Sequence, residues 1–368
     1  KAGVVPGATV EIRNLDTNLT RTQTTGEDGR FAFLLLPPGR YTVTVSKQGF
    51  ATIVQENVNL TVGQAFSLPV TMKVSAVAER IVVTATPVVD LIKTESSTTL
   101  NQVTVGTTPI LGRKFEDLLT LTPGVSIVQG PDGDEINFAG QRGIFNNISL
   151  DGGDYNNGFF GEQAGGQRAA IDITLDAVKE FQVVANSGSA EFGRTAGGII
   201  NVITKSGTNE VHGSLFHFQR LEALSANTSD NKPLKDFRRE QFGGTIGGPI
   251  QKDRTFFFFA VEQIFENLQR PNLSEPIGST PCPVPAPTVL ANEAQINSNP
   301  DCQRLALINF YQTSLSQSEG DPVKHTISNT NFLTKLDTKI TEGNLLSGSF
   351  SFDRSRNENQ TFDVATYG

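Results

Sequence analysis

The sequence of 368 residues contains no tryptophan, one methionine and two cysteines, and only 18% of its residues are charged. No stretch reaches the roughly 18 consecutive apolar residues of a membrane-spanning helix, so we expect no such helix. A barrel strand crosses a membrane with only about 10 alternating residues, so a membrane location stays open. The net charge of −8 argues against nucleic-acid binding, which usually needs a basic surface.

Motifs for catalysis and for cofactor binding are also missing. The three histidines are His212, His217 and His325, and none accompanies a nucleophile motif. Asp132 and Asp134 could meet calcium, but no twelve-residue loop with a closing glutamate follows them, so a solvated turn is the simpler interpretation. We therefore predict no enzyme, no metal and no cofactor.

Glycine and phenylalanine are abundant, with 35 and 25 residues. Together with many Thr and Asn residues they favour turns and strands over helices. The segment from Asn186 to Leu221 is the most informative, because a glycine-rich half leads into the apolar strand Ile199 to Ile203 and then into an alternating stretch. This change predicts a small inner domain joined to a long antiparallel sheet.

The same segment carries a family resemblance. EFGRTAGGIINVITKSGTNEVHGSLF resembles the plug-to-barrel junction of TonB-dependent outer-membrane receptors. It is most similar to their Oar-like branch, in which a carboxypeptidase-regulatory-like domain precedes the plug. Three further segments match in order: ILGRKFEDLLTLTPGV, NNISLDGGDYNN and FRREQFGGTIGGPIQKDRTFFFFAVE. The expected fold is therefore mainly β, with an N-terminal transthyretin-like β-sandwich, an α+β plug and the start of an antiparallel transmembrane β-barrel.

Residues 1–74 read as the β-sandwich, since alternating stretches are separated by Gly, Asp, Asn and Pro turns. TTGEDGRFAFLLLPPGRYTVTVSKQGF resembles the carboxypeptidase-regulatory-like module. Some relatives bind carbohydrate, but a purely structural module is the alternative. The start, VPGATVEIRN, reads as the middle of a sheet, so we expect a processed or truncated beginning.

Residues 75–95 form a linker around one apolar triplet. ERIVVTAT resembles the TonB box, a peptide that adds as a β-strand to the periplasmic domain of TonB. The resemblance implies that TonB binds Ile81, Val82, Val83, Thr84 and Ala85. An ordinary linker strand is the alternative.

Residues 96–205 would be the plug. FEDLLTLTPGV predicts a short helix that ends at Pro123-Gly124, and DAVKEFQVVAN predicts a helical turn followed by a strand. Loops 129–145 and 152–170 would meet the substrate, through Tyr155, Phe159, Phe160, Arg142 and Arg168. The alternative is that these aromatics pack on the barrel wall and the arginines pair with nearby carboxylates.

Residues 206–368 read as about five barrel strands with apolar and polar faces, although a soluble sandwich would alternate in the same way. Phe256 to Phe259 would face lipid and plug alternately. A long loop at about 266–328 would be extracellular. It contains Cys282 and Cys302, for which we predict a disulfide, with two unpaired thiols as the alternative.

The resemblance implies uptake across the outer membrane, driven by the proton gradient through TonB, with the N-terminal domain in the periplasm. The expected partners are TonB, outer-membrane lipid and an extracellular substrate. A siderophore, a glycan and a peptide are equally compatible with the residues as that substrate. A carbohydrate-binding or adhesion protein is one alternative, and a secreted hydrolase is another. A closed barrel needs at least about 8 strands, so five strands alone would transport nothing.

Overall fold

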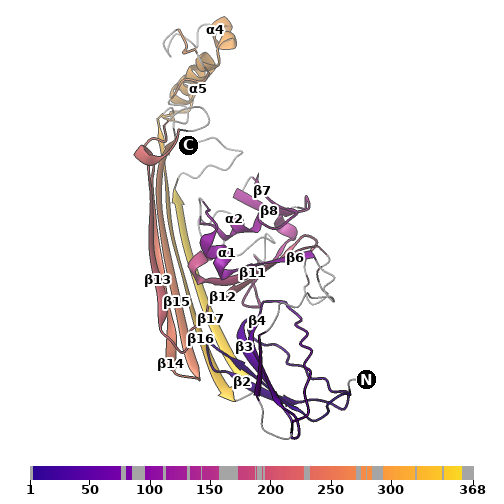
Figure 1. Ribbon diagram of the computed structural model, residues 1–368. Helices are drawn as coiled ribbons and strands as arrows, with labels where there is room; N and C mark the ends of the chain where they lie inside the picture. The colour runs from indigo at the N-terminus through magenta and orange to yellow at the C-terminus, as the bar shows by residue number, and fades with distance from the viewer. Residues whose placement is uncertain are drawn as a thin grey trace.

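The computed structural model describes residues 3–75, 80–84, 96–110, 113–130, 133–141, 143–156, 173–186, 188, 193, 195–227, 233–270, 275–278, 280–283, 293–319, 321–341 and 344–358. Three bodies follow one another along the chain: an N-terminal domain, the plug domain and a tall sheet, called the barrel sheet below (Figure 1). No helix among these residues is long and apolar enough to cross a membrane.

The N-terminal domain is built on one five-stranded sheet with the order β2-β1-β3-β4-β5. Neighbouring strands are antiparallel except β4 and β5, which run parallel. Alternating burial along β1 and β3 places Val10, Val43 and Val45 in the core beneath the sheet. The strands are β1 (Thr9–Asn14), β2 (Thr20–Thr24), β3 (Gly39–Ser46), β4 (Thr52–Leu60) and β5 (Arg80–Thr84).

The second layer of the predicted sandwich differs from expectation. Strands were expected along 21–36 and 65–74, but β2 ends at Thr24, and the structure assigns no strand at 25–38 or at 61–73. These two segments cross one face of the sheet in extended form instead, and side chains along them pack against the core, including Phe31, Phe33 and Phe66. The alternation of apolar and polar residues predicted correctly which side chains are buried. It does not show whether an extended segment forms hydrogen bonds with a neighbouring strand.

The plug domain contains a mixed sheet with the order β10-β9-β12-β11-β6 and a separate hairpin. Helix α2 packs on this sheet, where the ring of Phe115 stacks on Phe181 with centroids 5.9 Å apart. The helix predicted at 115 is present, but it ends at Leu119, before the expected end at Pro123-Gly124. The strand before Asp151, the turn there and the helical turn before Val178 are present, and the short strand β10 follows the turn where a loop was expected. The strands are β6 (Ser96–Asn101), β7 (Val125–Gly130), β8 (Gly133–Phe138), β9 (Asn147–Leu150), β10 (Gly153–Asp154), β11 (Val178–Asn186) and β12 (Ile199–Thr204). The helical segments are α1 (Gln102–Thr107), α2 (Phe115–Leu119), η1 (Gly143–Phe145) and η2 (Leu175–Ala177).

Glycine is required where the plug chain enters β12. A Cβ atom added at Gly198 would lie 2.3 Å from the ring of Phe138, and one at Gly197 would lie 2.4 Å from the side chain of Asn146. The glycine-rich half of the diagnostic segment therefore lets the backbone pass directly over a buried aromatic ring.

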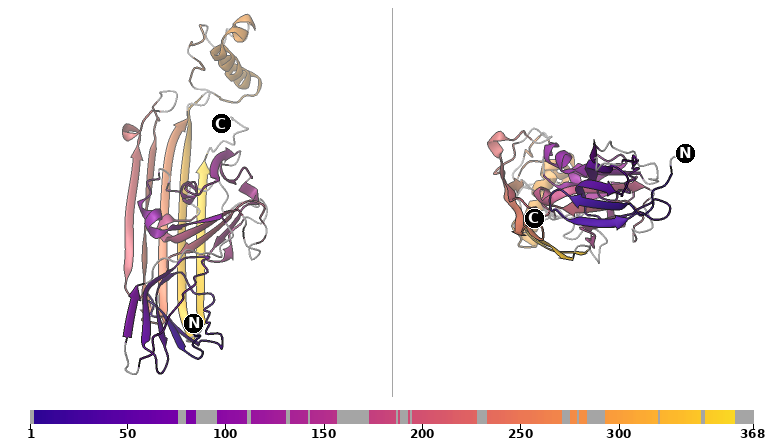
Figure 2. Two further views of the ribbon diagram at one scale, coloured as in Figure 1. Left: turned by 45° about the vertical axis from the view of Figure 1, so that its right-hand side comes forward. Right: turned by 60° about the horizontal axis from the view of Figure 1, so that its bottom comes forward.

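The barrel sheet has five antiparallel strands in chain order, as predicted. It stands along one side of the plug domain and reaches down beside the N-terminal domain (Figures 1 and 2). Successive residues point to opposite faces, so Phe256 and Phe258 are buried while Phe259 is exposed on the outer face. The strands are β13 (His212–Leu221), β14 (Arg238–Gln251), β15 (Thr255–Arg270), β16 (Val323–Thr341) and β17 (Asn344–Glu358), with η3 (Glu222–Leu224) after β13.

The long loop is shorter than predicted, and it is partly helical. Strand β15 continues to Arg270 and β16 begins at Val323, so pairing extends beyond the limits of about 266 and 328. The loop contains α4 (Glu293–Ser298) and α5 (Pro300–Ser314), which stand beyond the end of the barrel sheet (Figure 1). Asn299 caps α5 by accepting a hydrogen bond from Asp301 N–H, and Pro300 occupies the first turn, a typical helix start.

Candidate functional site

The predicted TonB-binding segment forms strand β5 at the edge of the N-terminal sheet. It pairs in parallel with β4, with Ile81 beside Ile53 and Val82 beside Val54. Ile81 packs against the N-terminal core, whereas Val82 and Val83 are 53% and 41% exposed. Ala85 lies outside the described residues. The segment is thus a strand, as predicted, but one that is already paired with its own chain.

The predicted substrate-binding residues are only partly described. Tyr155 is half-buried and packs against the plug core, and its backbone N–H donates to the carbonyl of Ile148. Phe159, Phe160, Arg142 and Arg168 lie outside the described residues.

A buried ion pair links the plug to the barrel wall. Lys335 Nζ on β16 lies 3.2 Å from Asp151 Oδ1 at the plug turn, and the side chains are 8% and 13% exposed. Thr204 joins both, since its backbone N–H donates to Asp151 Oδ1 at 2.9 Å and its hydroxyl accepts from Lys335 Nζ at 3.2 Å. The backbone of Asp151 is left-handed (φ 50°), which the tight turn with Gly152 requires.

A second polar contact crosses the same interface on the neighbouring strand. Glu262 on β15 is buried and accepts hydrogen bonds from Thr174 of the plug and from Gln241 of β14. The sequence does not identify Glu262 or Lys335 as plug contacts. Both strands carry further charged residues, such as Glu266 on β15 and Asp337 on β16, and only the fold shows which of them meets the plug.

Beside these polar contacts the interface is apolar. Phe258, Ala260 and Leu333 of the wall pack with Ala177 and Leu150 of the plug. Within the phenylalanine run, Phe258 thus packs on the plug, as predicted for one half of the run.

Arg113 forms a further bridge between plug and wall. Its guanidinium lies 4.6 Å from the ring centroid of Phe216 and 4.5 Å from that of Phe218, both on β13. It also forms an ion pair with Asp176 at 3.1 Å. Cation–π contact and ion pairing together hold the plug against the first strand of the sheet.

Arg113, Asp176 and Phe218 help to line a cavity of about 600 Å³ between the plug and strands β13 and β14. Its cationic side chains are Arg113, Lys205, Arg220 and Arg239. Burial lowers the pKa of Lys205 from its usual value, and the nearby Asp176 carboxylate opposes that shift.

The N-terminal domain is joined to the underside of the plug. The N–H of Val62 donates to Glu180 Oε1 at 2.7 Å, and Lys179 Nζ donates to the carbonyl of Pro38 at 2.6 Å. Burial raises the pKa of Glu180, which the Val62 N–H and the neighbouring ammonium partly offset. Burial also lowers the pKa of Lys179. Both charged residues therefore lie in a contact that excludes much of the water.

The same domain also contacts the barrel sheet. Asp253, in the short turn between β14 and β15, accepts hydrogen bonds from the side-chain amides of Asn18 and Asn209, both at 2.7 Å. The N–H of Asn209 donates to the carbonyl of Asp16. The N-terminal domain is therefore fixed to plug and barrel sheet at once.

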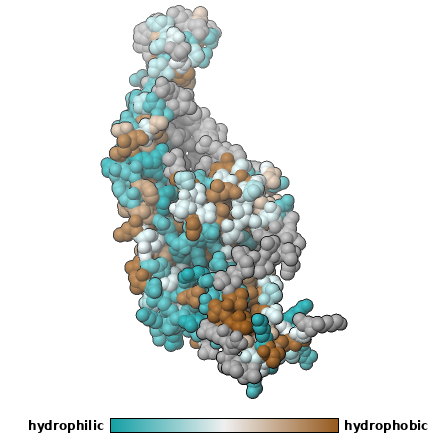
Figure 3. All heavy atoms as spheres, in the orientation of Figure 1, coloured by the Kyte–Doolittle hydropathy of each residue, from teal (hydrophilic) through white to brown (hydrophobic). Residues whose placement is uncertain are grey.

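The outer face of the barrel sheet is apolar. Side chains from four strands form rows of ring contacts on this face, including Phe242 with Phe265 and Phe332 with Phe350 and Phe352. In Figure 3, groups of brown, apolar residues lie among teal ones along the left edge of the molecule, where the barrel sheet stands. Neighbouring exposed apolar side chains of this kind mark a binding or membrane surface rather than a solvated one.

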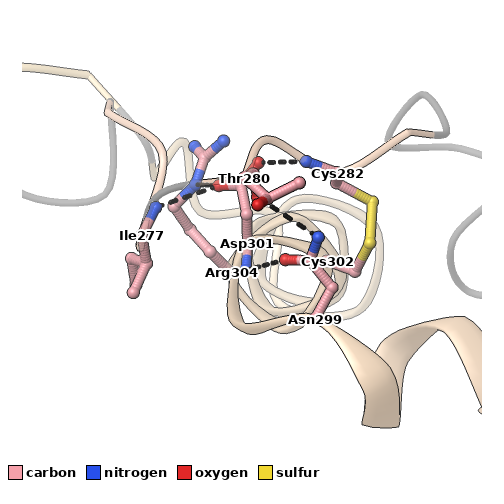
Figure 4. The surroundings of a disulfide bond; sticks show 7 residues. All are labelled: Ile277, Thr280, Cys282, Asn299, Asp301, Cys302 and Arg304. Carbon is pink, nitrogen blue, oxygen red and sulfur yellow. Dashed lines mark hydrogen bonds and ion pairs between the residues drawn. A yellow bond between two sulfur atoms is a disulfide. The ribbon is translucent and has the colours of Figure 1, made fainter.

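The loop cysteines are joined by a disulfide that pins the start of α5 (Figure 4). Asp301 beside it accepts from the N–H groups of Ile277 and Cys282 and pairs with Arg304 at 2.6 Å. In the part of the chain that the structure describes, no group of three His, Cys, Asp or Glu residues could hold a metal ion.

Two known domain families match the N-terminal domain and the barrel sheet separately. The family of outer membrane β-barrel domains matches residues 203–368, and the carboxypeptidase regulatory-like domain family matches residues 1–73. The TonB-dependent transporter Oar of Myxococcus xanthus is 28% identical over 286 residues, which cover 72% of this chain and 26% of that protein. The chain is similar to the Oar-like TonB-dependent transporters, with a carboxypeptidase regulatory-like domain at its N-terminus and an outer membrane β-barrel domain.

Other similar proteins carry related names. A probable TonB-dependent siderophore receptor, PirA of Acinetobacter baumannii, is 30% identical over 82 residues, which cover 22% of this chain and 10% of that protein. The ferric enterobactin receptor PfeA of Pseudomonas aeruginosa has a TM-score of 0.46 at 15% identity, over 72% of this chain and 34% of that one. YddB of Escherichia coli has a TM-score of 0.48 at 12% identity, over 73% and 34%.

The chain is thus part of an outer-membrane β-barrel protein, and its relatives are transporters rather than enzymes. It spans about a quarter of the length of the Oar transporter it matches. The five strands of the barrel sheet lie within the residues that match the outer membrane β-barrel domain.

Proposed function

We propose that the whole protein takes up a substrate across the outer membrane, driven by TonB pulling on residues 81–85. The carrying observation is that an apolar strand, β5, is placed directly before a plug that contacts the barrel wall through buried polar groups. Backbone hydrogen bonds to an added strand would supply the affinity for TonB. No covalent chemistry is involved.

The two ends of the barrel sheet support a periplasmic position for the N-terminal domain. One end carries the short turn at Asp253, where the domain is bound, and the other carries the long loop with α4 and α5. Barrels of this type have short periplasmic turns and long extracellular loops. A disulfide in the long loop suits an oxidising exterior.

The plug–wall contacts would define the closed state. Opening requires the energised state to offset the loss of the Lys335–Asp151 pair and of the Glu262 hydrogen bonds, because a partner shifts an equilibrium only through different interactions with its two states. A path for substrate would form where these contacts separate.

We propose the apical plug loops as the substrate site, with Tyr155, Phe159, Phe160, Arg142 and Arg168 as its residues. Aromatic and guanidinium groups would suit a siderophore, a glycan or a peptide. Packing of Tyr155 against the plug core gives it a positioning part in that site rather than a freely exposed one.

The carbohydrate-binding alternative receives no support from the N-terminal domain. Each aromatic residue in the described range 3–75 is at least partly buried, so this range presents no exposed aromatic platform.

Binding of the periplasmic domain of TonB to the purified full-length receptor tests the proposal. Val82→Pro should abolish binding, because proline lacks the N–H that a strand partner needs. Val82→Ile is the matched control, since it keeps an apolar, strand-favouring side chain, and should bind as the unaltered protein does. Equal binding by the proline variant would refute the assignment of the segment.

A further inference from the structure

Strand β5 fills an edge of the N-terminal sheet that would otherwise be open. Each residue from Arg80 to Thr84 has a partner in β4, from Thr52 to Glu56, in an unbroken parallel register. The pairing is not a chance meeting of loops, because Ile81 adds its side chain to the core that Ile53 belongs to. An unpaired strand edge is a template for another strand, and here the chain supplies that strand itself.

The position of Ile81 limits which side chains of β5 a binding partner can contact. Strand addition gains its specificity from alternate side chains. Val82 and Val83 are accessible on β5, but Ile81 is held in the N-terminal core. A partner that recognises Ile81 must first remove it from that core.

The N-terminal domain cannot simply travel with the strand. It is hydrogen-bonded to the plug through Val62 and Glu180, and to the barrel turn through Asn18 and Asp253. Because these bonds anchor the domain that contains β4, a strand drawn toward the periplasm has to leave β4 or break the anchors. Pairing with β4 therefore opposes the pull on β5.

We propose that the β4 edge, Thr52–Glu56, is a docking surface for the segment Arg80–Thr84, and that docking there competes with TonB for that segment. The inference rests on the proposed TonB-binding role of the segment. The docked strand is the resting form, and only the released strand binds TonB. The apparent affinity for TonB is then the affinity of the released strand multiplied by the fraction of molecules in which β5 has left β4.

A reversible cross-link across the β4–β5 pair tests this competition. Gln55 and Val83 are register partners and both side chains are partly accessible, so Gln55→Cys with Val83→Cys places two thiols on adjacent strands. Neighbouring strands lie about 4.8 Å apart, within the range of a disulfide. The full-length receptor is purified oxidised and reduced, and its binding to the periplasmic domain of TonB is measured.

The oxidised variant should bind TonB at least about tenfold more weakly than the reduced variant. The matched control is Glu11→Cys with Thr22→Cys, an exposed register pair between β1 and β2 that leaves β5 free. This control variant should bind TonB equally in its oxidised and reduced forms. Because reduction also opens the native loop disulfide in the control, equal binding shows that opening this disulfide does not affect TonB binding.

Two results would overturn the proposal: failure of the two introduced thiols to cross-link under oxidation, or equal binding in the oxidised and reduced states. Equal binding would mean that TonB adds to the outer edge of β5 while β5 stays docked. A failure of the proposed function would give a different result. If the segment did not bind TonB at all, the Val82→Pro variant would bind TonB normally, whether or not the cross-link affected binding.

Discussion

Replacing Lys335 by methionine should loosen the plug without unfolding the barrel. The substitution keeps a long apolar side chain but leaves the carboxylate of Asp151, 13% exposed, with only its hydrogen bonds from Thr204. Removing one partner of a buried ion pair typically costs about 3–5 kcal/mol. Because Thr204 still satisfies part of the carboxylate, we expect the lower end, about 3 kcal/mol.

The assay is hydrogen exchange of the full-length receptor, followed by mass spectrometry. Amides of β9 and β12 flank the ion pair and exchange through local opening of the plug. A loss of about 3 kcal/mol corresponds to roughly 100-fold faster exchange, since every 1.4 kcal/mol is a factor of ten. Amides of β14 and β15 should not change.

Two further variants make the test specific. Lys339→Met removes the same charge from the same face of the same strand and should leave β9 and β12 unaffected. In the double variant Asp151→Asn with Lys335→Met no charge of the pair remains buried, so exchange should return most of the way to that of the unaltered protein. Exchange within about threefold of normal for Lys335→Met alone would refute the reasoning.

Three other outcomes can be measured on the same protein. Gly198→Ala forces the ring of Phe138 to move and should lower plug stability by about 1–3 kcal/mol, seen as plug-selective unfolding in urea. Replacing Cys282 and Cys302 by serine should speed exchange in α5, by the roughly 3 kcal/mol that closing such a loop contributes, with no change in the barrel sheet. Burial raises the pKa of Glu180, so its contact with the N-terminal domain is strongest below the usual carboxyl pKa and weakens as the pH rises through the raised pKa. Proteolytic release of the N-terminal domain should therefore increase with pH over that range, and Glu180→Gln should remove this pH dependence.

Each of these has an outcome that contradicts it. Gly193→Ala, at a glycine with open space around it, is the control for the alanine series, and equal effects at both positions would show that packing is not the cause. Unchanged exchange in α5 without the disulfide would mean that Asp301 and its partners hold the helix alone. A pH dependence that survives Glu180→Gln would assign it to another group.

Local patterns predicted most of the local structure. Alternation along 332–340 and 346–352 predicted which side chains share a face of the sheet, because side chains on a strand point to opposite sides with a period of two. The helix predicted at 115 is present, although it ends at Leu119, and the turn expected at Pro123-Gly124 follows it, with Gly124 in a left-handed conformation (φ 83°). These features depend on neighbours within a few residues, which the sequence displays directly.

Features that depend on distant partners were not predicted. Nothing in ERIVVTAT shows that it pairs with Thr52–Glu56, since an edge strand has the same composition whichever neighbour it finds. Lys335 and Asp151 come from distant parts of the sequence and meet through the fold alone. Helix α5 was missed for another reason: its start signal, Asn299-Pro300, was read as loop composition.

The inner face of the barrel sheet has an apolar part and a polar part. The apolar part, formed by Phe258, Ala260 and Leu333, is where the plug packs. Exposing one such large side chain to water costs about 1.5–3 kcal/mol, so this part of the wall resists hydration even when the plug loosens. Farther along β16 the wall carries Asn329 and Asn331, which donate to Asp353 and lose little on contact with water. When the plug loosens, we therefore expect water to enter first on the asparagine side, and the plug to tilt about its apolar contact instead of leaving the wall as one body.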